Sequence, residues 1–146
     1  MKYELEIDID LPRERVVELF DDPDNLKKWQ PELVSFDHLD GEPGEPGARS
    51  RMVYKMGNKE VEMIETIATR NLPDAFSATY EAKGVHNRVD NRFIDLGDGR
   101  TRWLFETEFR FRGLMWLMST LMPGMFRKQS LKFMQQFKDF AEGARD

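Results

Sequence analysis

The sequence of 146 residues contains no cysteine, only two histidines and no apolar run long enough to cross a bilayer. The absence of cysteine excludes disulfide bonds, thiolate zinc sites and cysteine nucleophiles. The two histidines, His38 and His86, are too few for a histidine-rich metal centre, and no other residues show the spacing of a metal site. We therefore expect no metal ion, no cofactor and no catalytic histidine.

Basic residues are in the minority, with 22 Lys and Arg against 27 Asp and Glu and a net charge of −5. Nucleic-acid-binding domains normally carry a basic excess, so we expect no nucleic-acid partner. Residues 1–10 alternate between charged and apolar side chains and lack the apolar core of a secretory signal, so we expect a cytoplasmic protein. The length favours one domain spanning residues 1–146.

Hydrophobic spacing predicts how the chain begins. Apolar and charged residues alternate over Tyr3–Ile9, which is typical of a half-buried strand. A short amphipathic helix follows around Val16–Phe20. Asp22 and Pro23 then form an N-cap followed by proline, which predicts a second short helix ending near Trp29.

The remainder of the sequence is a run of strands followed by one long helix. Turn signals recur between residues 33 and 112 and predict six further strands joined as a meander. A Met- and Phe-rich helix is expected over residues 114–141, interrupted at Pro123-Gly124. The predicted fold is therefore α+β, with a seven-stranded antiparallel sheet, two short helices after the first strand and a long C-terminal helix.

Short hairpin loops determine which residues of neighbouring strands lie opposite one another, and opposed residues share one face of a sheet. We expect two-residue turns after Met56 and Ala82, a three-residue loop over Gly97–Gly99, and a pairing of Thr69 with Phe76. These registers bring the apolar side chains of the strands to one inner face. That face also receives a mostly polar row, made of Ser50, Glu65, Tyr80, Asn87 and Phe109.

The opposite face of the sheet is expected to be solvated and charged. On it, Arg88 lies opposite Glu108, and His86 belongs to the same face. His38 shares a strand face with Phe36, and we interpret it as a packed or edge residue.

Several short motifs accompany this order of elements: Leu11-Pro12, Asp22-Pro23, Trp29-Gln30-Pro31, Gly41–Ala48, Leu96–Thr101 and the Met- and Phe-rich terminal helix. Together they resemble the START-like, polyketide-cyclase and pollen-allergen superfamily, often called SRPBCC. The resemblance implies a helix-grip fold, in which a curved antiparallel sheet wraps around the long helix and leaves an apolar cavity between them. Members carry lipids, sterols or polyketides, cyclise or dehydrate polyketides, or act as co-chaperones, and they share no single catalytic set.

We therefore expect the chain to bind a hydrophobic small molecule, such as a lipid, isoprenoid, quinone or polyketide-like compound. The polar row would orient the ligand, and methionines around Pro123 would admit it, because flexible thioethers adapt to variable apolar shapes. The candidate ligand-binding residues are Ser50, Met52, Tyr54, Met63, Glu65, Tyr80, Asn87, Asn91, Trp103, Phe105, Phe109, Met118, Met122, Phe126 and Phe133.

Two features admit other interpretations. Burial would raise the pKa of Glu65, so Glu65 or Tyr80 could act as acid or base in a cofactor-free polyketide cyclase or dehydratase. The same row could equally serve a structural role through internal hydrogen bonds. Leu114–Met122 is apolar on all sides, which fits a ligand gate, contact with a membrane or partner, or simple core packing.

Overall fold

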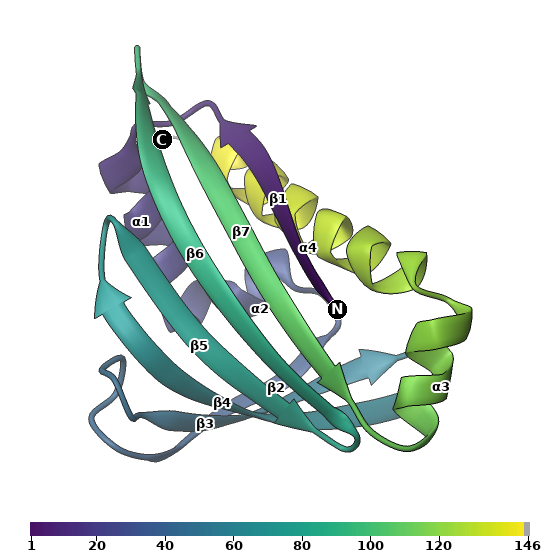
Figure 1. Cartoon of the computed structure of the whole chain (residues 1–146). Coiled ribbons are helices and arrows are strands. Elements are labelled where there is room, and N and C mark those ends of the chain that lie inside the picture. Colours follow the sequence, from purple (N-terminus) through teal and green to yellow (C-terminus); the bar gives the residue numbers. More distant parts are fainter. Residues whose placement is uncertain (145–146) are drawn as a thin grey trace.

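The computed structural model describes residues 1–144, in which seven strands form one antiparallel sheet (Figure 1). The strands are β1 (Lys2–Ile9), β2 (Leu33–Asp40), β3 (Arg49–Met56), β4 (Lys59–Asn71), β5 (Ala75–Ala82), β6 (Val85–Gly97) and β7 (Arg100–Phe111). Their spatial order is β1-β7-β6-β5-β4-β3-β2, so the first strand lies beside the last and the others form a meander. The predicted seven-stranded sheet is confirmed.

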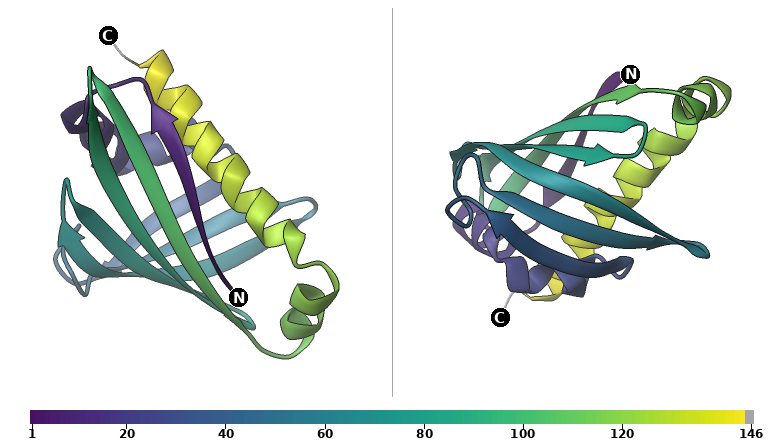
Figure 2. Two further views of the ribbon diagram at one scale, coloured as in Figure 1. Left: turned by 45° about the horizontal axis from the view of Figure 1, so that its top comes forward. Right: turned by 90° about the horizontal axis from the view of Figure 1, so that it is seen from below.

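The helices occupy two stretches of the chain. Between β1 and β2 lie α1 (Arg13–Asp21), the 3-10 turn η1 (Pro23–Asn25) and α2 (Leu26–Trp29), and after β7 come α3 (Leu114–Leu121) and α4 (Gly124–Gly143). The Asp22 carboxylate accepts a hydrogen bond from the Asp24 backbone N–H at 2.9 Å, which is the N-cap that the sequence predicted. Figure 2 shows the sheet curving around α4, which confirms the helix-grip fold.

The strand registers follow the hairpin argument, with two local corrections. Glu65 lies opposite Tyr80 as expected, but Phe76 pairs with Arg70, because the strand bulges between Ile67 and Thr69. The β6–β7 hairpin has Gly97 opposite Arg100, so its loop has two residues instead of the expected three. An irregularity between Asp95 and Gly97 offsets this difference, and Phe93 lies opposite Trp103 as expected. A bulge adds one residue to one strand only, so it changes the pairing on one side of itself and preserves it on the other.

The hydrophobic core is densest where α1 and the second half of α4 meet the sheet. Trp103, Phe93 and Phe137 are almost fully buried there. The ring of Phe20 from α1 packs edge-on against all three, at centroid distances of 5.0 Å to Phe93 and 5.7 Å to the other two. Met134, Phe137 and Ala141 form the buried stripe of α4, with the helical spacing that faces one side of a helix toward a sheet.

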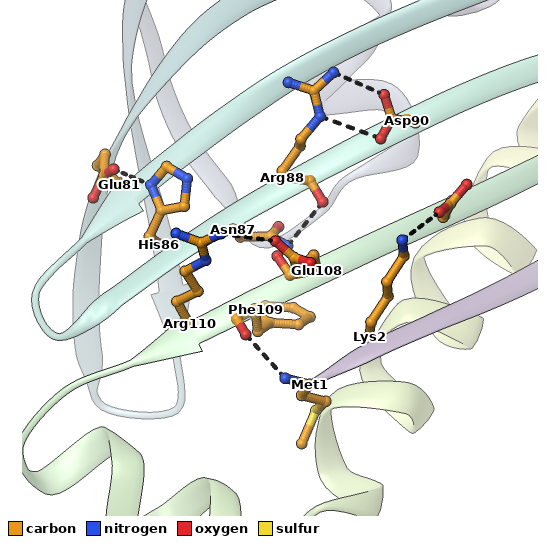
Figure 3. A network of polar contacts seen from close by, with 11 residues as sticks. Met1, Lys2, Glu81, His86, Asn87, Arg88, Asp90, Glu108, Phe109 and Arg110 are labelled. Carbon is orange, nitrogen blue, oxygen red and sulfur yellow. Dashed lines mark hydrogen bonds and ion pairs between the residues drawn. The ribbon is translucent and has the colours of Figure 1, made fainter.

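The outer face of the sheet is charged, as the sequence predicted (Figure 3). Arg88 does lie opposite Glu108, but its guanidinium pairs with Asp90 of its own strand at 3.1 Å. His86 contacts Glu81 on this face. These side chains are 40–51% exposed, and ion pairs in contact with solvent contribute little to stability.

Strand β2 forms one edge of the sheet and is irregular in two places. Its register against β3 shifts between Leu33 and Ser35 and again between His38 and Asp40. The shifts leave Val34 and Leu39 as exposed apolar residues.

Candidate functional site

A cavity of about 500 Å³ lies between the inner face of the sheet and the helices. Strands β2–β7, the η1–α2 segment and the first half of α4 supply its walls. The walls are mainly apolar and include Trp29, Phe36, Met52, Met63, Ile67, Phe76, Phe105, Phe109 and Phe133. Sites for small molecules typically measure about 300–1,000 Å³ and combine such walls with a few polar groups. The cavity is therefore large enough for a small organic ligand.

A carboxyl–phenol pair forms the polar part of the wall. Glu65 of β4 lies opposite Tyr80 of β5, and the Tyr80 hydroxyl donates to the Glu65 carboxylate at 2.8 Å. Burial raises the pKa of Glu65, and the hydrogen bond from Tyr80 partly opposes that shift. Burial and the neighbouring Glu65 charge raise the pKa of Tyr80 well above its ordinary value. The pair can therefore hold a proton inside an apolar cavity.

A second polar pair lies close to the first. The hydroxyl of Tyr54 donates to the side-chain oxygen of Gln30, and both residues line the cavity. Burial raises the pKa of Tyr54, and the Glu65 charge adds to this effect. Tyr54 and Tyr80 thus both remain neutral hydroxyls at neutral pH.

The rim of the cavity carries two ion pairs. Glu32 contacts Lys132 of α4 at 3.1 Å, which ties the segment before β2 to α4. The guanidinium of Arg70 binds Asp21 at the end of α1 through two hydrogen bonds. Both pairs join segments that are distant in the sequence.

Potential metal ligands are dispersed over the described part of the chain. Within residues 1–144, His, Asp and Glu side chains never gather in a group of three or more that could bind a metal.

The sequence profile of one protein family, described as "Polyketide cyclase / dehydrase and lipid transport", matches residues 1–142. The chain belongs to this family. Its members are described by cyclase, dehydrase and lipid-transport functions, which supports a ligand-binding or cyclase role with a small molecule as partner. No curated protein sequence is significantly similar to the chain.

Solved structures share the fold of this family member at low sequence identity. A protein from Thermus thermophilus aligns with a TM-score of 0.80 and 19% identity over 100% of both chains. The ZhuI aromatase/cyclase from Streptomyces sp. R1128 aligns with a TM-score of 0.82 and 13% identity, covering 97% of this chain and 93% of its own. Norcoclaurine synthase from Thalictrum flavum, in complex with dopamine and hydroxybenzaldehyde, aligns with a TM-score of 0.76 and 11% identity. The alignment covers 100% of this chain and 88% of the synthase chain.

Most of the candidate residues named from the sequence lie along the cavity. The lining includes Ser50, Met52, Tyr54, Met63, Glu65, Tyr80, Asn87, Asn91, Phe105, Phe109 and Phe133. The inner-face argument could place them because all but Phe133 belong to strands whose registers follow from hairpin length.

The two asparagines of β6 differ in what they leave for a ligand. Asn91 is buried, donates to the Phe76 carbonyl at 3.3 Å and accepts from the Trp103 indole at 2.9 Å. Both polar atoms of the Asn91 side chain are thus engaged in hydrogen bonds within the protein. The Asn87 amide nitrogen donates to the Thr107 hydroxyl at 2.7 Å, which leaves the Asn87 carbonyl oxygen as an acceptor for a ligand.

Four candidates lie outside the cavity lining. Trp103 is fully buried in the core, and Phe126 packs against Phe109 and Phe111 at centroid distances of 5.2 and 4.8 Å. Met118 and Met122 belong to or directly follow α3, outside the wall of the cavity. Strand alternation could place Trp103 on the inner face but could not tell core from cavity there. For the helical positions, the apolar stripe gives neither the orientation of α3 before the break at Pro123 nor how far along α4 the cavity extends.

The sequence argument missed the lining residues that come from helices, loops, edge strand β2 and the end of β4. They include Pro23, Leu26, Trp29, Gln30, Glu32, Phe36, His38, Arg70, Gln129 and Gln136. A signal for three of them was present. Gln129 and Gln136 share the helical face of Phe133, and Phe36 lies opposite Met52.

Proposed function

We propose that this family member binds a hydrophobic small molecule of lipid, isoprenoid, quinone or polyketide-like type in the cavity between the sheet and α4. The observation that carries the proposal is a cavity of about 500 Å³ with a mainly apolar wall and a few polar groups on one side. Removing apolar surface from water contributes about 25 cal/mol per Å² before ordering costs. The walls would therefore supply affinity, and the polar groups would set orientation.

Three polar groups support an oriented ligand. The Tyr80–Glu65 pair and the Tyr54 hydroxyl face the cavity from the strands. The indole nitrogen of Trp29 is buried at the cavity wall and finds no hydrogen-bond acceptor among the described residues. Buried donors are normally satisfied, so an acceptor on a bound molecule or a water fits this position.

The first experiment is denaturing solvent extraction of the purified protein followed by mass spectrometry. We expect an apolar compound in near-stoichiometric amount, and its structure would give the ligand class directly. A polar compound in that amount would contradict the proposal.

A titration with the fluorescent apolar probe phenylnaphthylamine tests the cavity itself. Ala82→Phe places a ring into the lining and should weaken probe binding by about tenfold or more, because it fills space that the probe needs. Ala75→Phe is the matched control, since Ala75 lies on the same strand outside the lining. Equal binding by both variants would locate the probe elsewhere and count against the cavity.

A cyclase is the second candidate function, and the buried Tyr80–Glu65 hydrogen bond favours it. As a carboxylate, Glu65 could take a proton from a carbon between two carbonyls of a bound poly-β-ketone. The resulting enolate carbon would attack a further carbonyl of the same molecule, and the new alkoxide would take the Tyr80 proton. Glu65 would then return its proton to Tyr80 through their hydrogen bond, which restores both groups. The solved relatives described as an aromatase/cyclase and as norcoclaurine synthase are consistent with such chemistry on this fold.

Glu65→Gln separates the two functions. A binding protein should keep its affinity for phenylnaphthylamine within a few-fold, because the amide can still accept from Tyr80. An enzyme should lose the cyclised product from a poly-β-ketone thioester, detected by mass spectrometry, while Tyr80→Phe should slow the formation of that product, because the alkoxide loses its proton donor. Absence of product from the wild-type protein would leave binding as the function.

A further inference from the structure

We propose that helix α3 binds the surface of a membrane that contains anionic lipids. The α3 surface consists of the exposed side chains of Leu114, Trp116, Leu117, Leu121, Met122 and Met125. The proposal goes beyond the binding of a small molecule in the cavity and does not rest on it.

The α3 surface gathers apolar side chains that the rest of the molecule buries. Six of the eleven large apolar residues exposed in residues 1–144 fall within positions 114–125. Leu114 and Leu121 are 73% and 71% exposed, and Trp116 is 58% exposed. Exposed apolar clusters of this kind mark contact with a partner or a membrane, whereas single exposed apolar residues are ordinary.

The polar groups of α3 are already satisfied inside the helix. The hydroxyls of Ser119 and Thr120 both donate to the Trp116 carbonyl, at 2.7 and 3.0 Å. An apolar environment penalises polar groups that lack partners, and these two hydroxyls have them. The helix can therefore enter the interfacial region of a bilayer without breaking hydrogen bonds.

The charge around α3 has the sign that anionic lipids attract. Residues 109–138 contain six of the 22 basic residues and none of the 27 acidic ones. Three of the six pair with acidic side chains from outside this range, namely Arg110 with Glu108, Lys132 with Glu32 and Lys138 with Glu142. Arg112, Arg127 and Lys128 are exposed on either side of α3 in the sequence. Lys83 belongs to the β5–β6 turn, where Gly84 lies against Met115 of α3. An apolar helix flanked by basic residues is the pattern of helices that lie in a membrane interface.

The same charge argues against a second copy of the chain as the partner. A symmetric dimer would bring two identical α3 surfaces together, and with them two sets of like charges. An anionic bilayer offers an apolar interior together with charges of opposite sign. The described helices are each too short or too polar to cross a bilayer, so α3 would lie in the surface.

Binding through α3 would bring one end of the cavity toward the bilayer. Ala82 and Val85 line the cavity and flank the Lys83-Gly84 turn that contacts α3. An apolar molecule could then pass between membrane and cavity with little exposure to water.

Flotation of the whole protein with lipid vesicles tests the proposal. We expect the protein to float with vesicles of equal parts phosphatidylcholine and phosphatidylglycerol, and to float poorly with phosphatidylcholine alone. The double variant Trp116→Glu, Leu121→Glu should reduce the bound fraction by about tenfold or more, because it replaces inserted apolar groups with charges that the anionic surface repels. High salt should also weaken binding of the wild type.

Leu39→Glu provides the matched control for Leu117→Glu. Both leucines are 46% exposed, but Leu39 lies on edge strand β2 and outside the α3 surface. We expect Leu117→Glu to lower flotation and Leu39→Glu to leave it unchanged. Equal losses in the two variants, or no flotation of the wild type with anionic vesicles, would overturn the proposal.

Tryptophan fluorescence gives an independent measurement. Trp29 and Trp103 are only 3% and 0% exposed, so a blue shift on adding anionic vesicles would come from Trp116. Trp116→Phe should still float but lose the blue shift. If the wild type is instead a dimer that Trp116→Glu converts to a monomer, a second copy covers this surface and the membrane proposal is wrong.

Discussion

Strands β6 and β7 border both the close-packed core and the cavity, and their inner faces differ between these two regions. At one end, Phe93 and Trp103 are almost fully buried and pack among the rings of α1 and α4. At the other end, Val85 and Phe109 line a cavity of about 500 Å³. The same pair of strands therefore supports a close-packed core and a hollow within one register.

Helix α4 shows the same division along its length. Its second half buries Met134, Phe137 and Ala141 against the sheet, while its first half presents Gln129, Ser130 and Phe133 to the cavity. The close-packed end can supply the stability that the hollow end lacks. Side chains at the cavity end are therefore less constrained by the stability of the fold and can serve ligand binding.

The largest expected effect is at the centre of the close-packed end. Trp103→Ala should lower the free energy of unfolding by about 3 to 5 kcal/mol, because it leaves a cavity among packed rings. Trp116→Ala, at an exposed position, should change it by less than about 1 kcal/mol. Urea denaturation of both variants measures the difference, and similar losses would refute the division between core and surface.

A matched methionine pair sharpens the comparison between the two ends. Met134 is 1% exposed in the core, whereas Met63 is half-buried at the cavity wall. Met134→Ala should cost about 2 to 4 kcal/mol of unfolding free energy, and Met63→Ala about 1 kcal/mol, because a wall that already borders empty space loses fewer contacts. Equal costs in thermal or chemical denaturation would mean that the cavity end is packed as tightly as the core.

The buried carboxyl makes the hollow end sensitive to pH. Burial raises the pKa of Glu65 above its ordinary value of 4.5, so the folded state binds the proton more tightly than the unfolded chain. The stability gained in this way is full below the unfolded pKa and is lost as the pH rises through the folded pKa. Glu65→Gln should therefore be more stable than the wild type at neutral pH, by about 1 kcal/mol.

Unfolding free energies of the two proteins across acidic to neutral pH measure this divergence. Glu60→Gln on the same strand is the control, because its side chain is exposed. Curves for Glu65→Gln and wild type that stay parallel at all pH values would show that the carboxyl does not titrate differently in the folded state.

The smallest effect is expected on the outer face of the sheet. Arg88→Ala removes an exposed pair with Asp90 and should change the unfolding free energy by no more than about 0.5 kcal/mol. Urea denaturation at low and high salt measures it. A loss above about 1 kcal/mol would show that this charged face contributes as much as the cavity wall.

The sequence predicted the fold and the polar row well because side chains alternate between the two faces of a strand, and a short turn determines which residues lie opposite one another. A two-residue turn at Gly57-Asn58 determines that Ser50 lies opposite Glu65, and alternation then determines the shared face. The bulge at Ala68 was not predictable from spacing. We expected Thr69 opposite Phe76, whereas Arg70 lies there. The extra residue of the bulge shifts the pairing back by one, so Glu65 lies opposite Tyr80 as predicted.

The helical part of the site was predicted less well. Periodicity tells which side of a helix is apolar, but not how a helix is rotated after a break such as Pro123. Periodicity also does not tell how far along α4 the cavity extends: Phe126 shares a stripe with Phe133 but packs on Phe111, outside the cavity lining. Gln30 and Glu32 were missed because they lie in a short irregular segment, where no period relates sequence to direction.

The two bulges of edge strand β2 also affect how copies of the protein behave beside one another. A straight edge strand offers a row of free backbone groups on which a further strand can add, and this is a common start of aggregation. The shifts at Val34 and Leu39 interrupt that row, and the exposed Asp37 adds negative charge to it. Within residues 1–144 no further strand pairs with β2 at this edge of the sheet, and its bulges and charge make it a poor template for a strand from another copy.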